Sequence, residues 1–137
     1  MEEYLLKDLT YELIGLSYKV FNKMGFGYQE KYYKRAYALE LSQLGKKFVQ
    51  ERKCVIVYQG RKIGMYFIDF VVENKVVIEF KIANDFYLQH TKQVLGYLKA
   101  SGLQLGLIVL MSKNGIRIKR IINEKSALSA NKNLRKI

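Results

Sequence analysis

The stretch that decides the fold is IDFVVENKVVIEFK, residues 68–81, in which two apolar runs flank a polar triplet. Side chains on a β-strand alternate between the two faces of a sheet, and residues 73–75 are typical of a tight turn. We therefore predict two consecutive antiparallel strands joined by this turn. That pairing places Asp69 opposite Glu79 on one face of the sheet, with Lys81 two residues further along the same face.

Two carboxylates in this position repel each other, because residues directly opposite on paired strands have Cβ atoms about 4.5–5.5 Å apart. The surrounding strands are otherwise apolar, and burial of unpaired carboxylates is strongly unfavourable. A bound divalent cation would remove the repulsion, and oxygen ligands beside a basic residue suit Mg²⁺ or Mn²⁺ better than zinc. Taken alone, Glu79 and Lys81 would also fit an ordinary exposed strand surface.

Composition limits the class of protein. The chain has 137 residues, half of them hydrophobic, which suits one domain with a sizeable core. We predict a single domain over residues 1–123 and a basic tail over residues 124–137. Cys54 and His90 are the only cysteine and histidine, which excludes an intramolecular disulfide and argues against structural zinc. With neither a secretory signal nor a membrane-spanning run, we expect a reduced, cytoplasmic protein.

The charge of the chain is strongly positive. Twenty-four Lys and Arg residues oppose twelve Asp and Glu residues, giving a net charge of +12. Such an excess suits a polyanionic partner, because phosphate neutralisation releases condensed counterions. We favour nucleic acid over an anionic membrane surface, since no segment shows the pattern of a basic amphipathic helix. The alternative to a nucleic-acid partner is that the positive charge only keeps the protein soluble.

Hydrophobic periodicity predicts the order helix, helix, three strands, helix, strand, strand. The second helix is expected to bury one face, consisting of Tyr33, Ala36, Tyr37, Leu41 and Leu44. Asn84 is expected to cap the third helix. We expect an α/β fold with a central mixed β-sheet flanked by helices. The expected helices cover about 6–24, 29–44 and 85–100, and the expected strands cover about 48–58, 62–72, 75–81 and 103–111, with an edge strand from 116.

Two helical positions carry further candidate residues. Glu30 and Tyr33 share a face at the start of the second helix, although the helix dipole alone would favour an acidic residue there. Gln93 and Tyr97 lie one turn apart on the third helix, which is also typical of an ordinary boundary stripe. His90 precedes Gln93 by three residues, and we expect it to be exposed or at the core edge rather than a ligand.

Taken together, these motifs resemble the GxxExxY family of small bacterial and archaeal proteins, a branch of the PD-(D/E)XK nuclease-like superfamily. The resemblance runs from about residue 9 to residue 122 and departs from the family at Phe26, where proline is usual, and at Leu110 and Met111, where Asn-Phe is frequent. It is carried by Gly27, Glu30 and Tyr33, by Asp69 with Glu79, Phe80 and Lys81, and by Gln93 with Tyr97, the Gln-x-x-x-Tyr pattern of recombination exonucleases.

The resemblance implies a restriction-endonuclease-like core and a metal-dependent nuclease that hydrolyses phosphodiester bonds in DNA, in preference to RNA. Asp69 and Glu79 would bind Mg²⁺ or Mn²⁺, with the Phe80 backbone carbonyl and Glu30 as further ligands. Lys81 would orient the attacking water. Gln93 would complete the catalytic residues, and Glu30, Tyr33 and Tyr97 would support them. A homodimer is compatible with these expectations.

Two other functions remain open from the sequence. The first is a non-catalytic nucleic-acid-binding module that keeps the nuclease fold. The second is a protein-interaction adaptor, which the many tyrosines and phenylalanines favour less because a core explains most of them. Basic clusters would serve the binding module without any metal, at Lys31/Lys34/Arg35, Arg52/Lys53, Arg61/Lys62 and Arg117/Lys119/Arg120.

Overall fold

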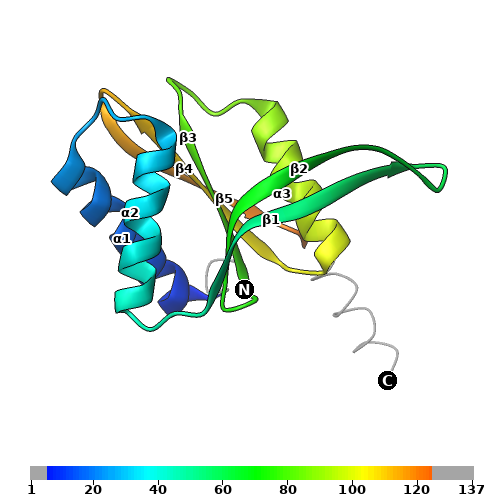
Figure 1. Cartoon of the computed structure of the whole chain (residues 1–137), viewed down its shortest axis with the longest axis horizontal. Coiled ribbons are helices and arrows are strands. Elements are labelled where there is room, and N and C mark those ends of the chain that lie inside the picture. Colours follow the sequence, from blue (N-terminus) through cyan, green and yellow to red (C-terminus); the bar gives the residue numbers. More distant parts are fainter. Residues whose placement is uncertain (1–5, 125–137) are drawn as a thin grey trace.

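The computed structural model describes residues 6–124, and its elements follow the predicted order (Figure 1). Of the predicted basic tail over residues 124–137, all but Glu124 lies outside the described residues. Among residues 6–124, no helix is long and apolar enough to cross a membrane. The elements are α1 (Lys7–Met24), α2 (Glu30–Gln43), β1 (Phe48–Tyr58), β2 (Arg61–Val72), β3 (Val76–Ile82), α3 (Leu88–Ser101), β4 (Leu105–Ser112) and β5 (Gly115–Ile122).

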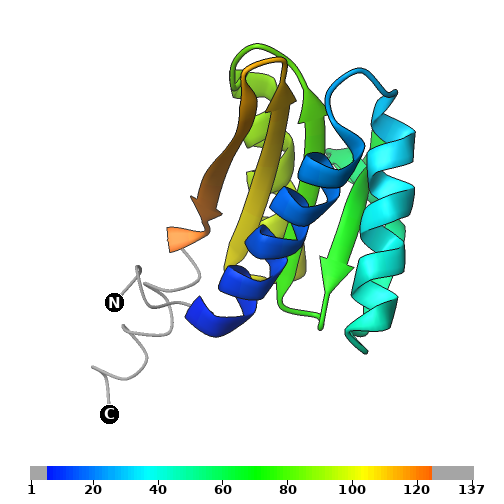
Figure 2. The ribbon, with the colours of Figure 1, turned by 90° about the vertical axis from the view of Figure 1, so that its left-hand side faces the viewer.

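The strands form one five-stranded sheet in the order β1-β2-β3-β4-β5. β3 and β4 are parallel, whereas the other neighbouring pairs are antiparallel. A parallel connection needs a crossover, and α3 provides it. Helices α1 and α2 cover one face of the sheet and α3 covers the other (Figure 2). The predicted mixed sheet flanked by helices is therefore confirmed.

The hydrophobic core has two parts, one on each face of the sheet. Period-two alternation along β3 sends Val76, Ile78 and Phe80 toward α1 and α2, whereas Val77 packs beneath α3. Every residue of β4 from Leu105 to Met111 is buried, as expected for a strand covered on both faces. This rigid centre holds β3, the strand that carries Glu79.

A tight turn sets the register between β2 and β3. Glu73 and Asn74 adopt left-handed φ angles of 53° and 52°, and the Lys75 amide donates to the Val72 carbonyl over 2.9 Å. Two consecutive positive φ values are the mark of a type I′ hairpin, whose twist matches that of the strands. The ladder that follows pairs Phe70–Val72 with Val76–Ile78, in the register that the sequence predicts.

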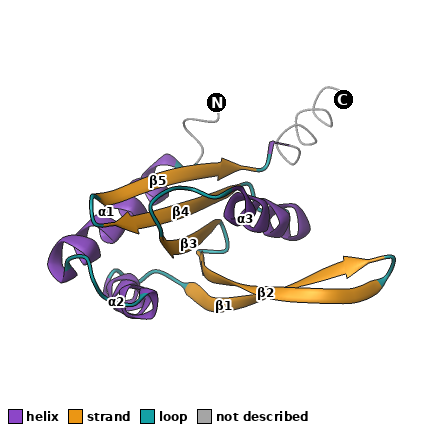
Figure 3. Ribbon diagram, turned by 90° about the horizontal axis from the view of Figure 1, so that it is seen from above, coloured by secondary structure: helices purple, strands orange, loops and turns teal. Residues whose placement is uncertain are grey.

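Most of the β1–β2 ribbon projects beyond the rest of the sheet. β1 and β2 pair from Phe48↔Val72 out to Tyr58↔Arg61, whereas β2 pairs with β3 through Phe70–Val72 alone. Figures 1 and 3 show the ribbon extending as an arm from the body of the molecule. Residues 52–68 are called the β-arm below.

Two sequence-based details are wrong. The third helix begins at Leu88 with Tyr87 as its N-cap residue, so Asn84 does not cap it. The Asn84 carbonyl instead accepts a hydrogen bond from Arg117 on β5 over 2.9 Å, which holds this segment outside the helix. Leu44 was expected to be buried, yet it is 48% exposed at the C-cap of α2.

Candidate active site

Asp69 and Glu79 lie together where the β2–β3 ladder ends. The two residues are 6% and 5% exposed. The backbone N–H of Asp69 donates to Glu79 Oε1 over 2.5 Å, and the N–H of Phe80 donates to Asp69 Oδ2 over 2.8 Å. The two carboxylates thus satisfy two backbone N–H groups just beyond the last ladder pair, Phe70 with Ile78. The geometry brings the predicted pair into one place and accounts for part of its burial.

Two lysines approach the carboxylates from different elements. Lys34 on α2 places its Nζ 3.1 Å from Asp69 Oδ1 and 3.7 Å from Glu51 Oε1 on β1. Lys81 on β3 places its Nζ 3.7 Å from Glu79 Oε2. The predicted neighbourhood of Glu79 and Lys81 is therefore present. Each buried carboxylate has a cation beside it, supplied by a different part of the chain.

The pKa values of both buried carboxyls are raised. Burial is the largest cause for each, because a charged carboxylate loses hydration. Asp69 raises the pKa of Glu79 further, whereas Lys81 and Lys34 lower it. For Asp69, the Phe80 amide and Lys34 also lower the pKa without cancelling the effect of burial. The charged pair is therefore incompletely compensated, and an additional cation would stabilise its ionised form.

Glu30, the first residue of α2, points a third carboxylate toward this region. Its pKa is raised, first by burial; Lys81 lowers it and Asp69 raises it, so Glu30 shares their electrostatic environment. Glu30 Oε1 is buried and has no hydrogen-bond partner among the residues described. A buried polar atom in this state normally has a water or an ion beside it.

The donor set fits a hard divalent cation. All the candidate donors are oxygens, which suit Mg²⁺ or Mn²⁺ rather than zinc. The N–H and C=O of a strand residue point to the same edge, so the Phe80 carbonyl faces the gap that its N–H spans. Within residues 6–124, no three Asp, Glu, His or Cys side chains are already grouped as a metal cage. A cation here would also compete with Lys34 for Asp69.

Tyr33 lies away from the carboxylates, in the core beneath α1. It is fully buried, and its hydroxyl donates to the Gly25 carbonyl over 2.5 Å and accepts from the Tyr28 amide over 3.3 Å. Its ring stacks on Phe21. Tyr33 therefore secures the turn between α1 and α2. It contributes to the site by positioning the start of α2, from which Glu30 extends.

The first turns of α3 lie near the other side of the carboxylate pair. The pKa of His90 is lowered, first by burial and then by Lys81, so the two side chains are close enough to interact. Gln93 is exposed, and its backbone carbonyl accepts a hydrogen bond from the Tyr66 hydroxyl over 2.6 Å. Tyr97 is buried in the core beneath α3. The structure thus places Gln93 on the surface and Tyr97 in the support of α3.

Sequence reasoning missed three residues of this region. Lys34 had been placed only in a basic cluster, although its position four residues after Glu30 puts both on one helical face. No sequence pattern indicated that Glu51 lies at the site, because its left-handed φ of 52° interrupts an otherwise regular strand. No pattern indicated Tyr66 either, since its bond to Gln93 depends on how β2 crosses α3.

A family model of the PD-(D/E)XK nuclease superfamily matches residues 7–121 of the chain. The chain belongs to that superfamily. Nucleases of this superfamily act on nucleic acid and usually use divalent metal ions. No curated protein matches the chain.

Several solved structures are similar to this PD-(D/E)XK chain, among them two of low sequence identity. One is an alkaline exonuclease, LHK-Exo, from Laribacter hongkongensis, with 14% identity and a TM-score of 0.46 over 70% of this chain and 57% of that one. The other is SSO0001, with 15% identity and a TM-score of 0.47 over 93% of this chain and 86% of that one. The chain thus spans little more than half the length of the exonuclease.

Proposed function

We propose that this chain is a divalent-metal-dependent nuclease of the GxxExxY type that hydrolyses phosphodiester bonds, in DNA rather than RNA. The observation that carries the proposal is the buried pair Asp69 and Glu79, with raised pKa values and Lys81 beside it. A core with no catalytic task would gain little from two carboxylates that cost free energy to ionise.

The acidic residues would hold the cation. Asp69 and Glu79 are the proposed ligands for Mg²⁺ or Mn²⁺, and the Phe80 carbonyl and Glu30 would complete the set with water. The buried, unpartnered Glu30 Oε1 supports its inclusion. When bound, the cation would supply Lewis-acid stabilisation of the charge that develops on the scissile phosphate.

The remaining residues would orient water and substrate. Lys81, held 3.7 Å from Glu79 Oε2, would donate a hydrogen bond to the attacking water and stabilise negative charge on the phosphate. Gln93, exposed near the start of α3, would hydrogen-bond the phosphate backbone. Tyr97 and Tyr33 would keep α3 and α2 in place from the core. We further propose one domain over residues 1–123 in a cytoplasmic protein, with a homodimer left to measurement.

The test is cleavage of single-stranded, duplex and branched DNA and of RNA by the purified chain in Mg²⁺, Mn²⁺ or EDTA. We expect cleavage that requires metal and falls by about a hundredfold or more in Asp69→Asn and Lys81→Ala, because each variant removes transition-state stabilisation. Asp85→Asn is the matched control, since it removes the charge of an exposed carboxylate that pairs with Arg117 instead.

A non-catalytic nucleic-acid-binding module is the second candidate, and the Lys34–Asp69 ion pair favours it because Lys34 partly neutralises the site without metal. Thermal unfolding separates the two. A nuclease site should bind Mn²⁺ and be stabilised by it in the wild type and in Asp85→Asn but not in Asp69→Asn. Metal-independent stability together with cleavage that persists in both active-site variants would exclude the nuclease.

A further inference from the structure

The β-arm exposes apolar side chains on both of its faces. On one face, the cross-strand neighbours Val55 and Met65 are exposed, and Phe67 beside them is 48% exposed. Ile56 is exposed on the opposite face. Near the tip, Val57 and Ile63 are 59% and 65% exposed. Exposed apolar side chains gathered on one element mark an interaction surface.

The charge of the β-arm identifies the kind of partner. The segment contains Arg52, Lys53, Arg61 and Lys62, and no Asp or Glu occurs anywhere in residues 52–68. All four basic residues are exposed. A ribbon with only positive charges complements a polyanion, and its apolar side chains need a partner that also offers non-polar surface. Nucleic acid, with phosphates outside and base edges in its grooves, has both.

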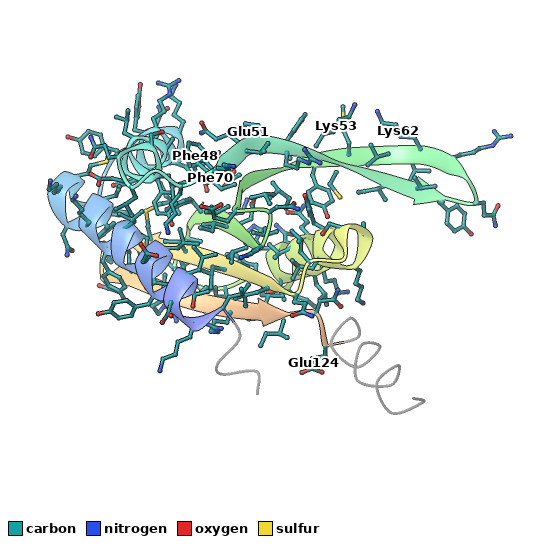
Figure 4. All side chains as sticks on the ribbon, turned by 90° about the horizontal axis from the view of Figure 1, so that it is seen from below. Phe48, Glu51, Lys53, Lys62, Phe70 and Glu124 are labelled. Atoms are coloured by element: carbon teal, nitrogen blue, oxygen red, sulfur yellow. The ribbon has the colours of Figure 1, made fainter. Side chains whose placement is uncertain are left out.

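The base of the β-arm ends beside the carboxylate pair. Phe67 comes two residues before Asp69 on β2, and Lys34 Nζ lies 3.1 Å from Asp69 Oδ1 and 3.7 Å from Glu51 Oε1 on β1. Lys53 pairs with Phe67, and Lys62 Nζ lies 3.8 Å from Met65 Sδ. Figure 4 shows Glu51, Lys53 and Lys62 following one another along the ribbon from the α2 end toward the tip. A polymer that follows the ribbon from its tip toward α2 would therefore reach the candidate active site.

Because apolar side chains are exposed on both faces of the β-arm, a partner whose groove surrounds the arm fits it better than a partner that stacks on one face. A single strand stacked on the ribbon would cover one face and leave the other in water. The major groove of a duplex, about 12 Å wide, admits a two-stranded β-ribbon and can contact both faces at once. From Lys53 to Tyr58 the arm spans five residue steps, about 17 Å at 3.3–3.4 Å per residue, the length of about five base pairs.

We propose that the β-arm inserts into a groove of double-stranded nucleic acid and holds the duplex against the Asp69–Glu79 site. Arg52, Lys53, Arg61 and Lys62 contact phosphates, and Val57 and Ile63 contact the floor of the groove. This inference rests on the proposed nuclease function, from which it takes nucleic acid as the partner. The grip, meaning the binding of a duplex by the β-arm, requires no catalysis.

The test measures binding of the full chain to a fluorescent DNA duplex and to one of its strands, by anisotropy in EDTA. Two double variants change the β-arm: Val57→Ser/Ile63→Ser and Arg61→Gln/Lys62→Gln. Each should weaken duplex binding by about tenfold, and the second should also reduce the salt slope by nearly two. The matched controls, Tyr11→Ser/Leu39→Ser and Lys75→Gln/Lys99→Gln, change residues outside the β-arm that are also exposed and should stay within twofold of wild type.

A second readout separates the grip from the chemistry. Hydrolysis of a small chromogenic phosphodiester in Mn²⁺ should be unchanged by the β-arm variants while duplex cleavage falls. If the wild type shows no hydrolysis but the β-arm variants still lose duplex affinity, the nuclease proposal fails and the grip stands. Duplex binding near wild type in both β-arm variants would overturn the grip, even where cleavage is confirmed.

Other occupants of the β-arm give different results. If light scattering shows that the wild type is a dimer and that Val57→Ser/Ile63→Ser is a monomer with unchanged duplex affinity, a second copy covers the arm and the inference fails. Equal losses of duplex and single-strand affinity would overturn insertion into a groove. Tighter binding to anionic lipid vesicles than to duplex, lost in the same variants, would assign the arm to a membrane surface instead.

Discussion

The two oxygens of the Asp69 carboxylate have different partners. Oδ2 accepts from the Phe80 amide, whereas Oδ1 faces the Lys34 ammonium group. The amide belongs to the backbone and stays in place, but a lysine side chain can move. Lys34 therefore supplies a positive charge beside Asp69, and we expect a metal ion bound by Asp69 to displace it.

Replacement of Lys34 tests that idea. Lys34→Gln should tighten Mn²⁺ binding, because the competing positive charge is gone, and should lower the free energy of unfolding in EDTA by about 1–3 kcal/mol. Calorimetry and urea unfolding measure the two effects. Lys19→Gln, which breaks an exposed pair with Glu40, is the control and should cost less than about 1 kcal/mol with no change in metal affinity. Weaker metal binding in Lys34→Gln would contradict the displacement.

The raised pKa of Glu79 makes stability depend on pH. In the unfolded chain this carboxyl has its ordinary pKa of about 4.5, whereas burial in the folded protein raises the pKa and keeps the proton bound to higher pH. The contribution of Glu79 to the free energy of unfolding is therefore fully present below about pH 4.5. It is lost as the pH rises through the pKa of Glu79 in the folded protein. In EDTA, the stability of the wild type relative to Glu79→Gln should fall over that interval. Urea unfolding at several pH values measures the free energy of unfolding of both proteins. If the difference between wild type and Glu79→Gln did not change with pH, the raised pKa of Glu79 would be refuted.

At the residue scale, the sequence was informative where the contacts are local. The pairing of Asp69 with Glu79 follows from strand alternation and one short turn. Lys34 reaches the same site from another element, α2, so no local sequence pattern could predict its contact with Asp69. Glu51 joins it only because the backbone is irregular at that residue.

The packing of α3 on the sheet depends on one glycine of β4. A Cβ atom at Gly106 would lie 2.6 Å from Val94 Cγ1 of α3, much closer than carbon atoms approach in folded proteins. The absence of a side chain therefore lets the helix and the strand approach closely. Because α3 also carries His90 and Gln93, this contact helps to set the distance between the first turns of α3 and the carboxylate pair.

Replacement of that glycine should be costly. Gly106→Ala should lower the free energy of unfolding by about 1–3 kcal/mol, because Val94 or the helix must shift to make room. Gly15→Ala is the matched control. It lies on α1 with no atom within 4 Å of the added Cβ, and it should stabilise the protein by up to about 1 kcal/mol. Chemical denaturation of both variants measures the difference, and equal effects would contradict close packing at Gly106.

Element positions were largely predictable, and the exceptions have a common cause. β1 has the bounds that its alternation predicts, and the other strands differ by one or two residues. The start of α3 was placed too early, because Arg117 from the far end of the chain engages Asn84. The projection of the β-arm was equally hidden, since it depends on how few residues β2 shares with β3. Contacts between distant segments decide both features.

Across the whole molecule, the net charge of +12 should make binding to nucleic acid strongly dependent on salt. If the four basic residues of the β-arm each neutralise one phosphate, duplex affinity should fall by about a hundredfold between 50 and 200 mM salt. Anisotropy titrations over that range measure the slope. A nearly flat dependence would instead favour the protein-interaction adaptor.

The short ladder between β2 and β3 also has a mechanical consequence. β2 pairs with β3 through Phe70–Val72, and beyond Asp69 the base of the β-arm is held beneath α3 by Ile68 and Tyr66. About five residues, or some 16 Å, separate Tyr66 from the end of the ribbon. A tilt of about 10° at Tyr66 would move the tip by roughly 3 Å, while Asp69, on the anchored side of Tyr66, would hardly move. We therefore expect the tip of the arm to follow a curved partner while the acidic pair stays aligned.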